Sequence, residues 1–351
     1  MTRSFTPNEY AQLRDFLARE FGLFFDSTKV TFLENRVMPF FEKLHCADMN
    51  GLISVMQCDQ ARRIELLDVI TTNETWFFRH PRHFDILRDE VFPPLFRARE
   101  RDQRRELSIW SAGCSIGAEA YSIAITIREL IRDLSPWNIK IIGSDISSSA
   151  LEKARKGRYT AAELKLLSNM LLTHYFVPTG TGEFEIKPEL AGMVRFEHLN
   201  LLDPWPDRRF DIIFCRNTMI YFKENTKAAL TERFYRMLEP DGVFFTSATE
   251  TLHWKGDNEF EKLFLHGEYI YHKRPASKTY VLYRFLTPSD LLRALNLMVK
   301  FNYEYQLMNV PQPSPSAPRK ALFIPKNIQT IVDKMFDEAN LRRASCEEFR
   351  K

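Results

Sequence analysis

The feature of this 351-residue chain that most constrains its fold is an alternation of apolar runs and helical stretches between residues 107 and 247. Short apolar runs that end in small or polar residues are typical of buried strands, whereas the stretches between them carry apolar residues on one helical face. This alternation predicts a doubly wound α/β fold, a parallel sheet with helices on both faces. The predicted strands are LSIWSAG, IKIIGSDIS, VRFEHLNLL, FDIIFCRN and GVFFTSAT, and the helices between them are AEAYSIAITIRELIRDL, SSALEKARKG and KAALTERFYRML.

The part of the chain before this alternation is predicted to be helical. NEYAQLRDFLAREFG has the apolar spacing of a helix stripe and stops at Gly22, and two further stretches, STKVTFLENRVMPFFEKL and ARRIELLDVIT, also have a helical pattern. No alternation of the strand type interrupts them. We therefore expect a small all-α domain with its linker over residues 1–85.

The sheet domain is predicted to cover residues 86–275, with an inserted β subdomain at about 160–195. Within that insertion YFVPTGTGEFEIKPEL has the turn residues of a hairpin, and FEKLFLHGEYIYHKR predicts a closing antiparallel pair. Residues 276–351 are predicted to form a helical and proline-rich extension. It would contain a helix at LTPSDLLRALNLMVKF, a stiff linker at 311–318, and a charged amphipathic helix over the last thirty residues.

Composition excludes several classes of protein. The formal net charge of +3 is too small to indicate nucleic-acid binding, and no apolar run has the ~18 residues of a membrane span, so we expect no membrane insertion. Five scattered cysteines without a C-x-x-C pair indicate free thiols in a reducing cytoplasm. His80 and His83 have the only metal-like spacing, and no cysteine or carboxylate completes a ligand set, so no metal site is predicted.

The loop after the first predicted strand, SAGCSIGAEA, indicates what kind of ligand the sheet binds. Gly113 and Gly117 let the backbone approach a ligand, but the pattern is G-x-x-x-G and not the G-x-G-x-x-G of dinucleotide folds. Glu119 follows where a phosphate needs room and positive charge. This loop therefore favours a cationic or hydroxyl-bearing ligand.

Three further strand ends carry polar residues, and ligands of open parallel sheets bind at these ends. Asp145 could accept hydrogen bonds from ribose hydroxyls, and Asn200 with Leu201 could bind an adenine edge. Each feature alone has an ordinary explanation, since aspartate also caps helices and glycine also forms turns. In this order and without a phosphate-binding motif, they favour S-adenosylmethionine and methyl transfer over hydride transfer. The end of the fourth strand carries Arg216, Asn217 and Tyr221.

Over residues 10–275 the chain resembles the CheR-type chemoreceptor glutamate O-methyltransferases. The resemblance implies transfer of a methyl group from S-adenosylmethionine, without a metal, to glutamates in the cytoplasmic helical region of chemoreceptors. It also implies that S-adenosylhomocysteine is the product and that the protein is cytoplasmic. The stretches that carry it are TTNETWFFR, IWSAGCSIGAEAYSIA, SDISSSALEKARKGRY, NLLD, FDIIFCRNTMIYF and DGVFFTSATETL.

The resemblance also implies a role for individual residues. Arg79, in the segment that closes over the cofactor, would lie beside the sulfonium and the substrate, and Tyr221 would direct its hydroxyl at the reacting carboxylate. Glu119 would bind the amino end of the cofactor, and Asp145 its ribose. The residues expected to bind the cofactor are Asn73, Thr75, Arg79, Glu119, Asp145, Asn200, Leu201, Arg216 and Asn217.

The protein is expected to dock on the chemoreceptor directly, without a peptide tether. Some family members capture a receptor C-terminal peptide with a longer loop in the inserted subdomain, but the loop VPTGTGEFEIKPEL is short here. We expect no dependence on such a tether and predict docking on the receptor helices through Lys29, Arg36 and Lys43. Three alternatives remain open: a nicotinamide-dependent oxidoreductase, a cofactor-binding signalling module, and a methyltransferase of this fold with another protein substrate.

Overall fold

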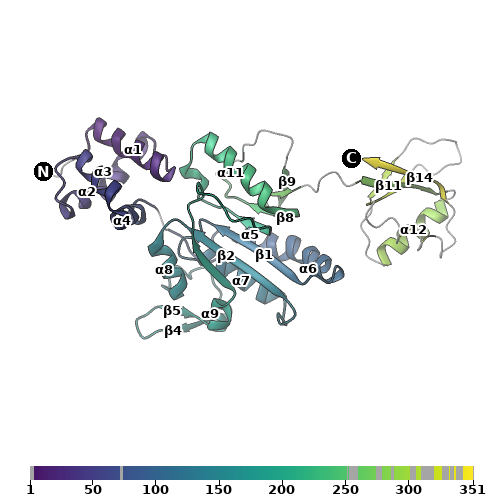
Figure 1. Ribbon diagram of the computed structural model, residues 1–351. Helices are drawn as coiled ribbons and strands as arrows, with labels where there is room; N and C mark the ends of the chain where they lie inside the picture. Colours follow the sequence, from purple (N-terminus) through teal and green to yellow (C-terminus); the bar gives the residue numbers. More distant parts are fainter. Residues whose placement is uncertain are drawn as a thin grey trace. The chain divides into compact units, whose positions relative to one another are not determined.

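The chain forms two compact units, residues 1–273 and 274–351 (Figure 1). No helix in the part of the chain described here is both long and apolar enough to cross a bilayer. The computed structural model describes residues 4–71, 74–250, 252, 260–273, 279–285, 288–300, 306–309, 320–325, 332, 336 and 343–350.

The first unit begins with the predicted all-α domain. Its first helix starts at a capping box, in which Thr6 and Glu9 satisfy each other's backbone N–H groups, and it ends at Gly22 with φ +73°. The three predicted helices are confirmed, and a fourth, α3, lies between the second and third of them. The helices are α1 (Pro7–Phe21), α2 (Val30–Lys43), α3 (Met49–Cys58) and α4 (Gln60–Ile70).

A seven-stranded sheet follows, and it confirms the predicted fold class. The strand order is β6-β2-β1-β7-β8-β10-β9; β6, β2, β1, β7 and β8 are parallel, whereas β10 pairs antiparallel with both β8 and β9. The order reverses at β1, which is where an open α/β sheet forms its ligand-binding crevice. The strands are β1 (Glu106–Ala112), β2 (Asn138–Asp145), β6 (Val194–His198), β7 (Phe210–Phe214), β8 (Leu238–Phe245), β9 (Phe260–Leu265) and β10 (Glu268–Lys273).

Helices cover both faces of this sheet, and alternate strand residues point to two different cores. Phe244 of β8 packs in one core with Phe234 of α11, and the N-terminal helices contribute to the same core. The neighbouring Val243 and Phe245 lie in the other core with Ile123 of α7. The helices around the sheet are α5 (Pro81–Ile86), α6 (Phe92–Arg101), α7 (Ala118–Leu130), α8 (Ser148–Lys156) and α11 (Glu224–Met237).

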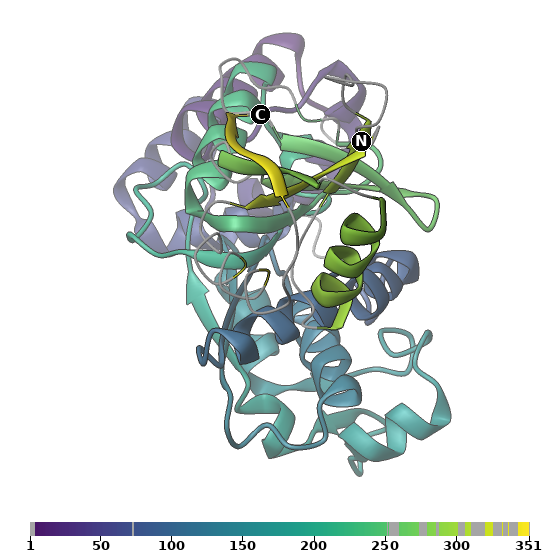
Figure 2. The ribbon, with the colours of Figure 1, turned by 90° about the vertical axis from the view of Figure 1, so that its right-hand side faces the viewer.

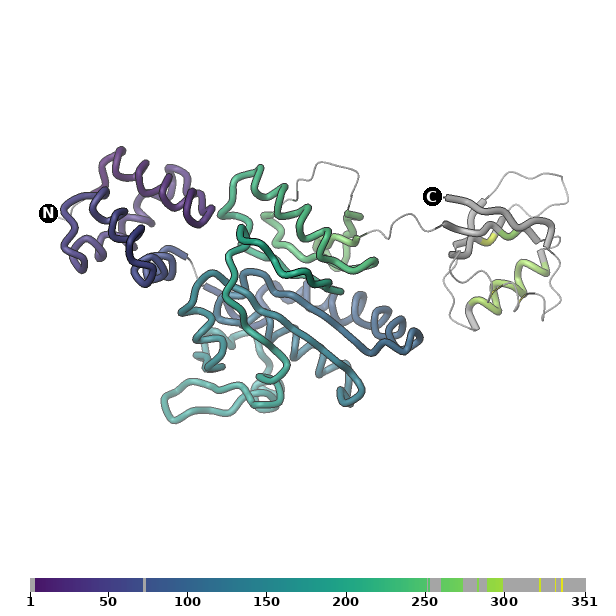
Figure 3. Tube along the Cα trace, in the orientation of Figure 1, coloured from purple at the N-terminus to yellow at the C-terminus, as the bar shows by residue number. Residues whose placement is uncertain are grey.

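The predicted insertion is a small antiparallel sheet with strand order β3-β5-β4 (Figure 3). Its hairpin turn is closed by the Thr179 N–H, which donates to the Glu183 carbonyl at 2.8 Å, and Gly182 has φ +82°. The elements of the insertion are β3 (Arg158–Tyr159), α9 (Asn169–Tyr175), β4 (Phe176–Pro178), β5 (Phe184–Ile186) and α10 (Pro188–Ala191).

The second unit is an antiparallel sheet of order β12-β13-β11-β14, against which α12 packs (Figure 2). The predicted helix at α12 is confirmed, and the proline-rich stretch 311–318 lies outside the described residues. Tyr283 of β11, Met298 of α12 and Leu322 of β13 share its core. The elements are β11 (Thr279–Phe285), α12 (Pro288–Lys300), β12 (Gln306–Asn309), β13 (Lys320–Pro325) and β14 (Arg343–Arg350).

The prediction of a helix over the last thirty residues is wrong for 322–325 and 343–350, whereas Val332 and Phe336 are helical and the other residues of that stretch lie outside the described residues. Lys320–Pro325 and Arg343–Arg350 are strands, and β14 pairs with β11 from Thr279 to Phe285. Pairing with a neighbouring strand supplies the backbone hydrogen bonds of β14, and this long-range contact overrides the local helical pattern of RASCEEFR. The described part of the extension therefore combines a four-stranded sheet with helix and is not helical throughout.

Candidate functional site

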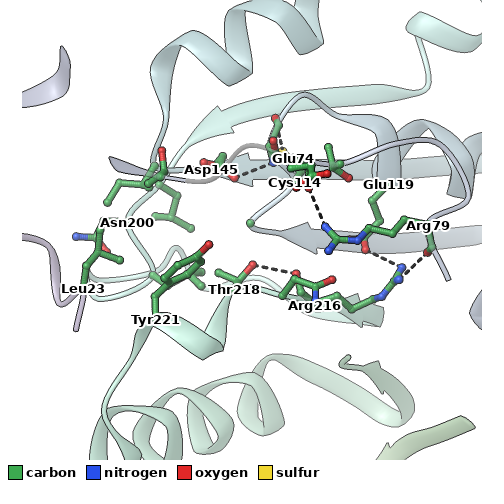
Figure 4. A pocket seen from close by; sticks show the side chains of 18 of the residues that line it. Leu23, Glu74, Arg79, Cys114, Glu119, Asp145, Asn200, Arg216, Thr218 and Tyr221 are labelled. Carbon is green, nitrogen blue, oxygen red and sulfur yellow. Dashed lines mark hydrogen bonds and ion pairs between the residues drawn. The ribbon is translucent and has the colours of Figure 1, made fainter. Parts of the chain in front are cut away.

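A pocket lies at the carboxyl ends of β1, β2 and β7, where the strand order reverses (Figure 4). Residues of the all-α domain, Phe21 and Leu23, complete its wall. Every predicted site residue that the structure describes lines this pocket, and Asn73 lies outside the described residues. The predicted residues found there are Thr75, Arg79, Glu119, Asp145, Asn200, Leu201, Arg216, Asn217 and Tyr221.

Glu119 and Arg216 form a buried ion pair on one side of the pocket. Arg216 Nη1 lies 3.1 Å from Glu119 Oε2, and the two side chains are 2% and 14% exposed, respectively. The Ser111 hydroxyl donates to Glu119 Oε1 at 2.7 Å. Burial raises the pKa of Glu119, and the Arg216 charge and the Ser111 hydrogen bond counteract this rise. Arg216 thus compensates a carboxylate that would otherwise be costly to bury.

Arg216 also connects this pair to the segment that precedes α5. Its Nη2 donates to the Arg79 carbonyl at 2.6 Å. Its Nε is buried, and no acceptor among the described residues reaches it. A buried guanidinium N–H without an acceptor is consistent with a ligand group that completes its hydrogen bonding.

Asp145 ends β2 and lies on the opposite side of the pocket. Its Oδ2 accepts the Ser115 N–H at 2.7 Å and its Oδ1 accepts the Ser147 N–H at 2.9 Å. Burial raises the pKa of Asp145, and the backbone N–H groups act in the opposite direction. Each carboxylate oxygen has a second lone pair, so the group can still accept hydrogen bonds from a diol. Ser147 in turn donates to Asp68 of α4 at 2.6 Å, which connects this turn to the all-α domain.

The segment from Glu74 to Arg79 forms part of the pocket wall. Phe77 N–H donates to the Glu163 carbonyl of the insertion, and Phe78 N–H donates to Ser122 Oγ of α7, both at 2.9 Å. The Arg79 guanidinium lies 4.9 Å from the centre of the Trp76 ring and donates to the Glu74 carbonyl at 2.8 Å. The segment is therefore fixed to the insertion and to the sheet domain at once.

Tyr221 and Asn217 come from the loop after β7. Tyr221 lies on a 3₁₀ turn, Met219–Tyr221, and its carbonyl accepts the Phe24 N–H at 2.7 Å. Asn217 adopts φ +57°, a left-handed conformation that asparagine tolerates better than most residues.

The sequence predicted that Gly113 gives room to a ligand, but a Cβ at Gly113 would meet Thr218 Oγ1 of the loop after β7 at 2.1 Å. Gly113, with φ +78°, therefore allows the β1 and β7 loops to approach each other.

The two histidines beside the segment are uncharged at neutral pH. Burial and the Arg216 charge lower the pKa of His83 to about 3 and that of His80 to about 4, and Arg79 lowers the latter further. In the described ranges, no three His, Cys, Asp or Glu side chains are grouped so that they could hold a metal ion. The cationic residues among those that line the pocket are Arg79 and Arg216.

Several lining residues were not predicted from the sequence. Phe21 and Leu23 come from the all-α domain, and Leu199 and Phe222 flank predicted residues. Apolar residues at strand ends give no signal that distinguishes a ligand wall from a core. Leu199, Asn200 and Leu201 follow one another in the chain, so the motif around Asn200 could have suggested the first of these additions.

This donor and acceptor set fits S-adenosylmethionine. Asp145 offers acceptors for a diol, Glu119 offers an acceptor for an ammonium group, and Ile146, Leu199 and Leu201 supply apolar walls for a flat ring. A carboxylate stands at the start of α7, where a dinucleotide site would bind phosphate.

Comparison with known families decides the assignment. The family models described as "CheR methyltransferase, all-alpha domain" and "CheR methyltransferase, SAM binding domain" match residues 8–71 and 73–268. The chain belongs to the CheR methyltransferase family. The resemblance identified from the sequence is thereby confirmed, and the protein is a member of a family of methyltransferases that bind S-adenosylmethionine.

Curated relatives of the CheR family align over most of their length. The chemotaxis protein methyltransferase of Borreliella burgdorferi is 33% identical over 73% of this chain and 92% of its own. The corresponding proteins of Salmonella typhimurium and Escherichia coli are 35% and 34% identical, over 71% and 75% of this chain and 84% and 89% of their own.

Proposed function

We propose that this protein transfers a methyl group from S-adenosylmethionine to glutamate side chains of chemoreceptors and thereby forms methyl esters during chemotactic adaptation. The observation that supports this most directly is a single pocket lined by the carboxylates of Asp145 and Glu119 together with Arg79 and Tyr221. Relatives named chemotaxis protein methyltransferase, at 33–35% identity, support the same function.

We propose that the cofactor binds in this pocket in the orientation that the family resemblance implies. Asp145 would hold the ribose, Asn200 and Leu201 the adenine, and Glu119 the amino group. Thr75, Arg216 and Asn217 would line the methionine end, with Asn73 beside them by resemblance. When bound, S-adenosylmethionine supplies an electrophilic methyl group on a sulfonium, and S-adenosylhomocysteine remains after the transfer.

Methyl transfer to a carboxylate requires little general acid–base catalysis from the protein. A substrate glutamate with a pKa of about 4.3 is already ionised at neutral pH, so neither a general base nor a metal is required to generate the nucleophile. Positioning of the carboxylate against the methyl group then contributes much of the rate enhancement. The half-buried Arg79 would orient the carboxylate, and the Tyr221 hydroxyl would donate a hydrogen bond to it.

Arg79 is held in a way that suits this role. One nitrogen is used by the Glu74 carbonyl and the guanidinium plane lies beside Trp76. A guanidinium has five N–H donors, so further ones remain to direct a carboxylate. Because the side chain is restrained, it can orient the nucleophile without collapsing into a tight ion pair that would reduce its reactivity.

The substrate itself is tested by labelling. Membranes that contain chemoreceptors are incubated with the protein and methyl-labelled cofactor, and label on receptor bands is then tested for release by alkali. Alkali-labile label on receptors supports the proposal, and its absence in the presence of wild-type protein overturns it. Ester label on another protein would instead favour a different substrate, and binding of S-adenosylhomocysteine without any transfer would favour a signalling module.

We propose further that docking does not depend on a receptor peptide. The hairpin turn of the insertion is short and closed on itself, since the Thr179 hydroxyl and N–H both reach the Glu183 carbonyl at 2.9 and 2.8 Å. The proposed docking residues are Lys29, Arg36 and Lys43. Arg36 donates to the Val69 carbonyl at 2.8 Å and keeps its full charge, whereas the charge of Lys43 is offset by its ion pair with Glu65.

A titration distinguishes the two modes of docking. A peptide from a receptor C-terminus is added to the isotope-labelled protein, and the backbone amide signals of the protein are followed by NMR. Micromolar binding that shifts signals from residues 177–190 would overturn the tether-free proposal. Absence of binding, together with methylation that falls as salt rises, would support docking through the basic residues.

A further inference from the structure

Glu250, which follows β8, has a buried carboxylate with an unusual concentration of donors around it. The residue is 6% exposed. Its Oε2 accepts the Asn217 N–H at 2.8 Å, the Ser247 N–H at 3.1 Å and the Ser247 hydroxyl at 2.6 Å. Its Oε1 accepts the Ile220 N–H at 3.2 Å. Two of these donors belong to its own turn, and the other two belong to the loop after β7.

The two donors from the β7 loop, the N–H groups of Asn217 and Ile220, each lie next to a residue that lines the pocket. Asn217 follows Arg216, which pairs with Glu119 and holds the Arg79 carbonyl. Ile220 precedes Tyr221, whose side chain lines the pocket. The carboxylate of Glu250 therefore fixes the backbone at both ends of the stretch that carries the two functional side chains.

The local backbone explains why this stretch needs an external acceptor. Asn217 adopts φ +57°, and such a conformation persists only where the surroundings hold it. The 3₁₀ turn Met219–Tyr221 has only three residues, and the first N–H groups of a helical turn have no acceptor within it. Ile220 N–H is one of these groups, and Glu250 supplies its acceptor.

We infer that Glu250 is a positioning residue for methyl transfer, which acts through the backbone at Ile220 to set where Tyr221 presents its hydroxyl. The inference rests on the proposed function, because it assumes that Tyr221 acts on the reacting carboxylate. Glu250 itself does not line the pocket and contacts neither cofactor nor substrate in this assignment.

Asp211 provides a matched control. It is also 6% exposed, its carboxylate accepts the Ser108 N–H at 2.8 Å, and it pairs with Arg99. Asp211 belongs to β7, the strand whose loop Glu250 holds, but it lies at the other end of that strand. A buried carboxylate that serves only the fold should behave like Asp211 in every measurement.

Glu250→Gln is the decisive substitution because the two carboxylate oxygens have different partners. The glutamine oxygen can keep the position of Oε2 and its three donors, whereas the amide NH₂ would face the Ile220 N–H and could not accept from it. We expect kcat to fall about tenfold, the effect of losing one hydrogen bond to a charged group at a catalytic position. The Kd of S-adenosylhomocysteine should change by less than about twofold, because the anchor at Asn217 remains.

The experiment compares wild type, Glu250→Gln and Asp211→Asn. For each protein, kcat, KM for the cofactor, the Kd of S-adenosylhomocysteine and the unfolding midpoint are measured. Asp211→Asn should lower the midpoint and leave kcat unchanged. A wild-type kcat in Glu250→Gln, or a loss of kcat that Asp211→Asn reproduces, would show that Glu250 only stabilises the fold. If Glu250→Gln does not fold, Glu250→Asp, which withdraws the carboxylate from Ile220, takes its place.

Hydrogen–deuterium exchange separates this inference from the proposed function. Exchange at residues 216–222 needs no substrate, and it should be faster in Glu250→Gln than in wild type and in Asp211→Asn. If the wild-type protein labels no receptor, the proposed substrate is wrong, and the exchange rates still decide whether Glu250 holds the turn of Tyr221. Equal exchange in all three proteins would overturn the inference whatever the substrate.

Discussion

Replacing Arg216 by methionine should convert the buried ion pair of the pocket into a single buried carboxylate. The substitution keeps much of the apolar volume of the side chain but removes its charge 3.1 Å from Glu119. It also removes the hydrogen bond to the Arg79 carbonyl. Breaking a buried pair by removing one partner typically costs about 3–5 kcal/mol, because the remaining charge is uncompensated.

Protonation of Glu119 sets an upper limit on the free-energy cost of losing Arg216, because a neutral carboxyl no longer leaves an uncompensated charge in the protein. Holding a carboxyl of ordinary pKa about 4.3 in its neutral form costs about 3.7 kcal/mol at pH 7 and about 1 kcal/mol at pH 5, at 1.36 kcal/mol per pH unit. The lost hydrogen bond to Arg79 adds about 1 kcal/mol at either pH. We therefore expect Arg216→Met to lower the free energy of unfolding by about 4–5 kcal/mol at pH 7 and by about 2 kcal/mol at pH 5.

The sign follows from the pKa of Glu119. Burial already raises this pKa in the folded protein, and loss of Arg216 removes the main factor that lowers it. A carboxyl with a higher pKa in the folded than in the unfolded state binds more protons when folded, so the stability of the variant falls as the pH rises. The difference between wild type and variant must therefore grow from pH 5 to pH 7.

The assay is urea unfolding followed by tryptophan fluorescence, since all five tryptophans lie in the first unit. The double variant Glu119→Gln, Arg216→Met removes the ionisable group and should lose most of the pH dependence. Equal destabilisation of Arg216→Met at pH 5 and pH 7 would refute the reasoning. A double variant no more stable than Arg216→Met at pH 7 would refute it as well.

Three further outcomes are expected. Asp145→Ala should weaken S-adenosylhomocysteine binding about tenfold or more by calorimetry, and unchanged binding would remove Asp145 from the site. Arg79→Ala and Tyr221→Phe should lower kcat more than they weaken cofactor binding, and a wild-type rate in either variant would end its assigned role. Gly22→Ala should destabilise the protein by more than about 1 kcal/mol in urea unfolding. Gly22 has φ +73° and a Cβ there would meet Leu202 at 2.0 Å, so Gly180→Ala, with nothing within 4 Å, is the control that should be neutral.

The parallel sheet and the polar residues at its strand ends could be predicted from the sequence because both follow from local patterns. Asp145 and Glu119 were identified by their place after an apolar run, and the topology then brings such ends together. Arg79 and Asn73 have no such local signal and were assigned by resemblance. Arg79 lines the pocket in the structure, whereas Asn73 stays a prediction.

What local patterns could not supply is the pairing of distant groups. The sequence gives no indication that Glu250 faces Ile220 across two loops, or that Arg216 neutralises Glu119, because the residues of each pair are 30 and 97 positions apart. The strand β14 escaped prediction for the same reason, since its partner β11 lies some sixty residues earlier and its own residues have a helical pattern. In each case a long-range contact decides the outcome.

Long-range contacts also explain why aromatic residues precede a cation in the segment TTNETWFFR. Its aromatic part is an anchor: Phe77 is fully buried, lies 4.8 Å from the Tyr159 ring and 5.3 Å from the Phe176 ring, and its N–H reaches the insertion. The conformation beyond it is strained, since Phe78 adopts φ +55°. Ser122 holds Phe78 on one side of this strain, and the buried Arg216 holds the carbonyl of Arg79 on the other. The aromatics and the strained backbone thus hold one cation, Arg79, in the wall of the pocket.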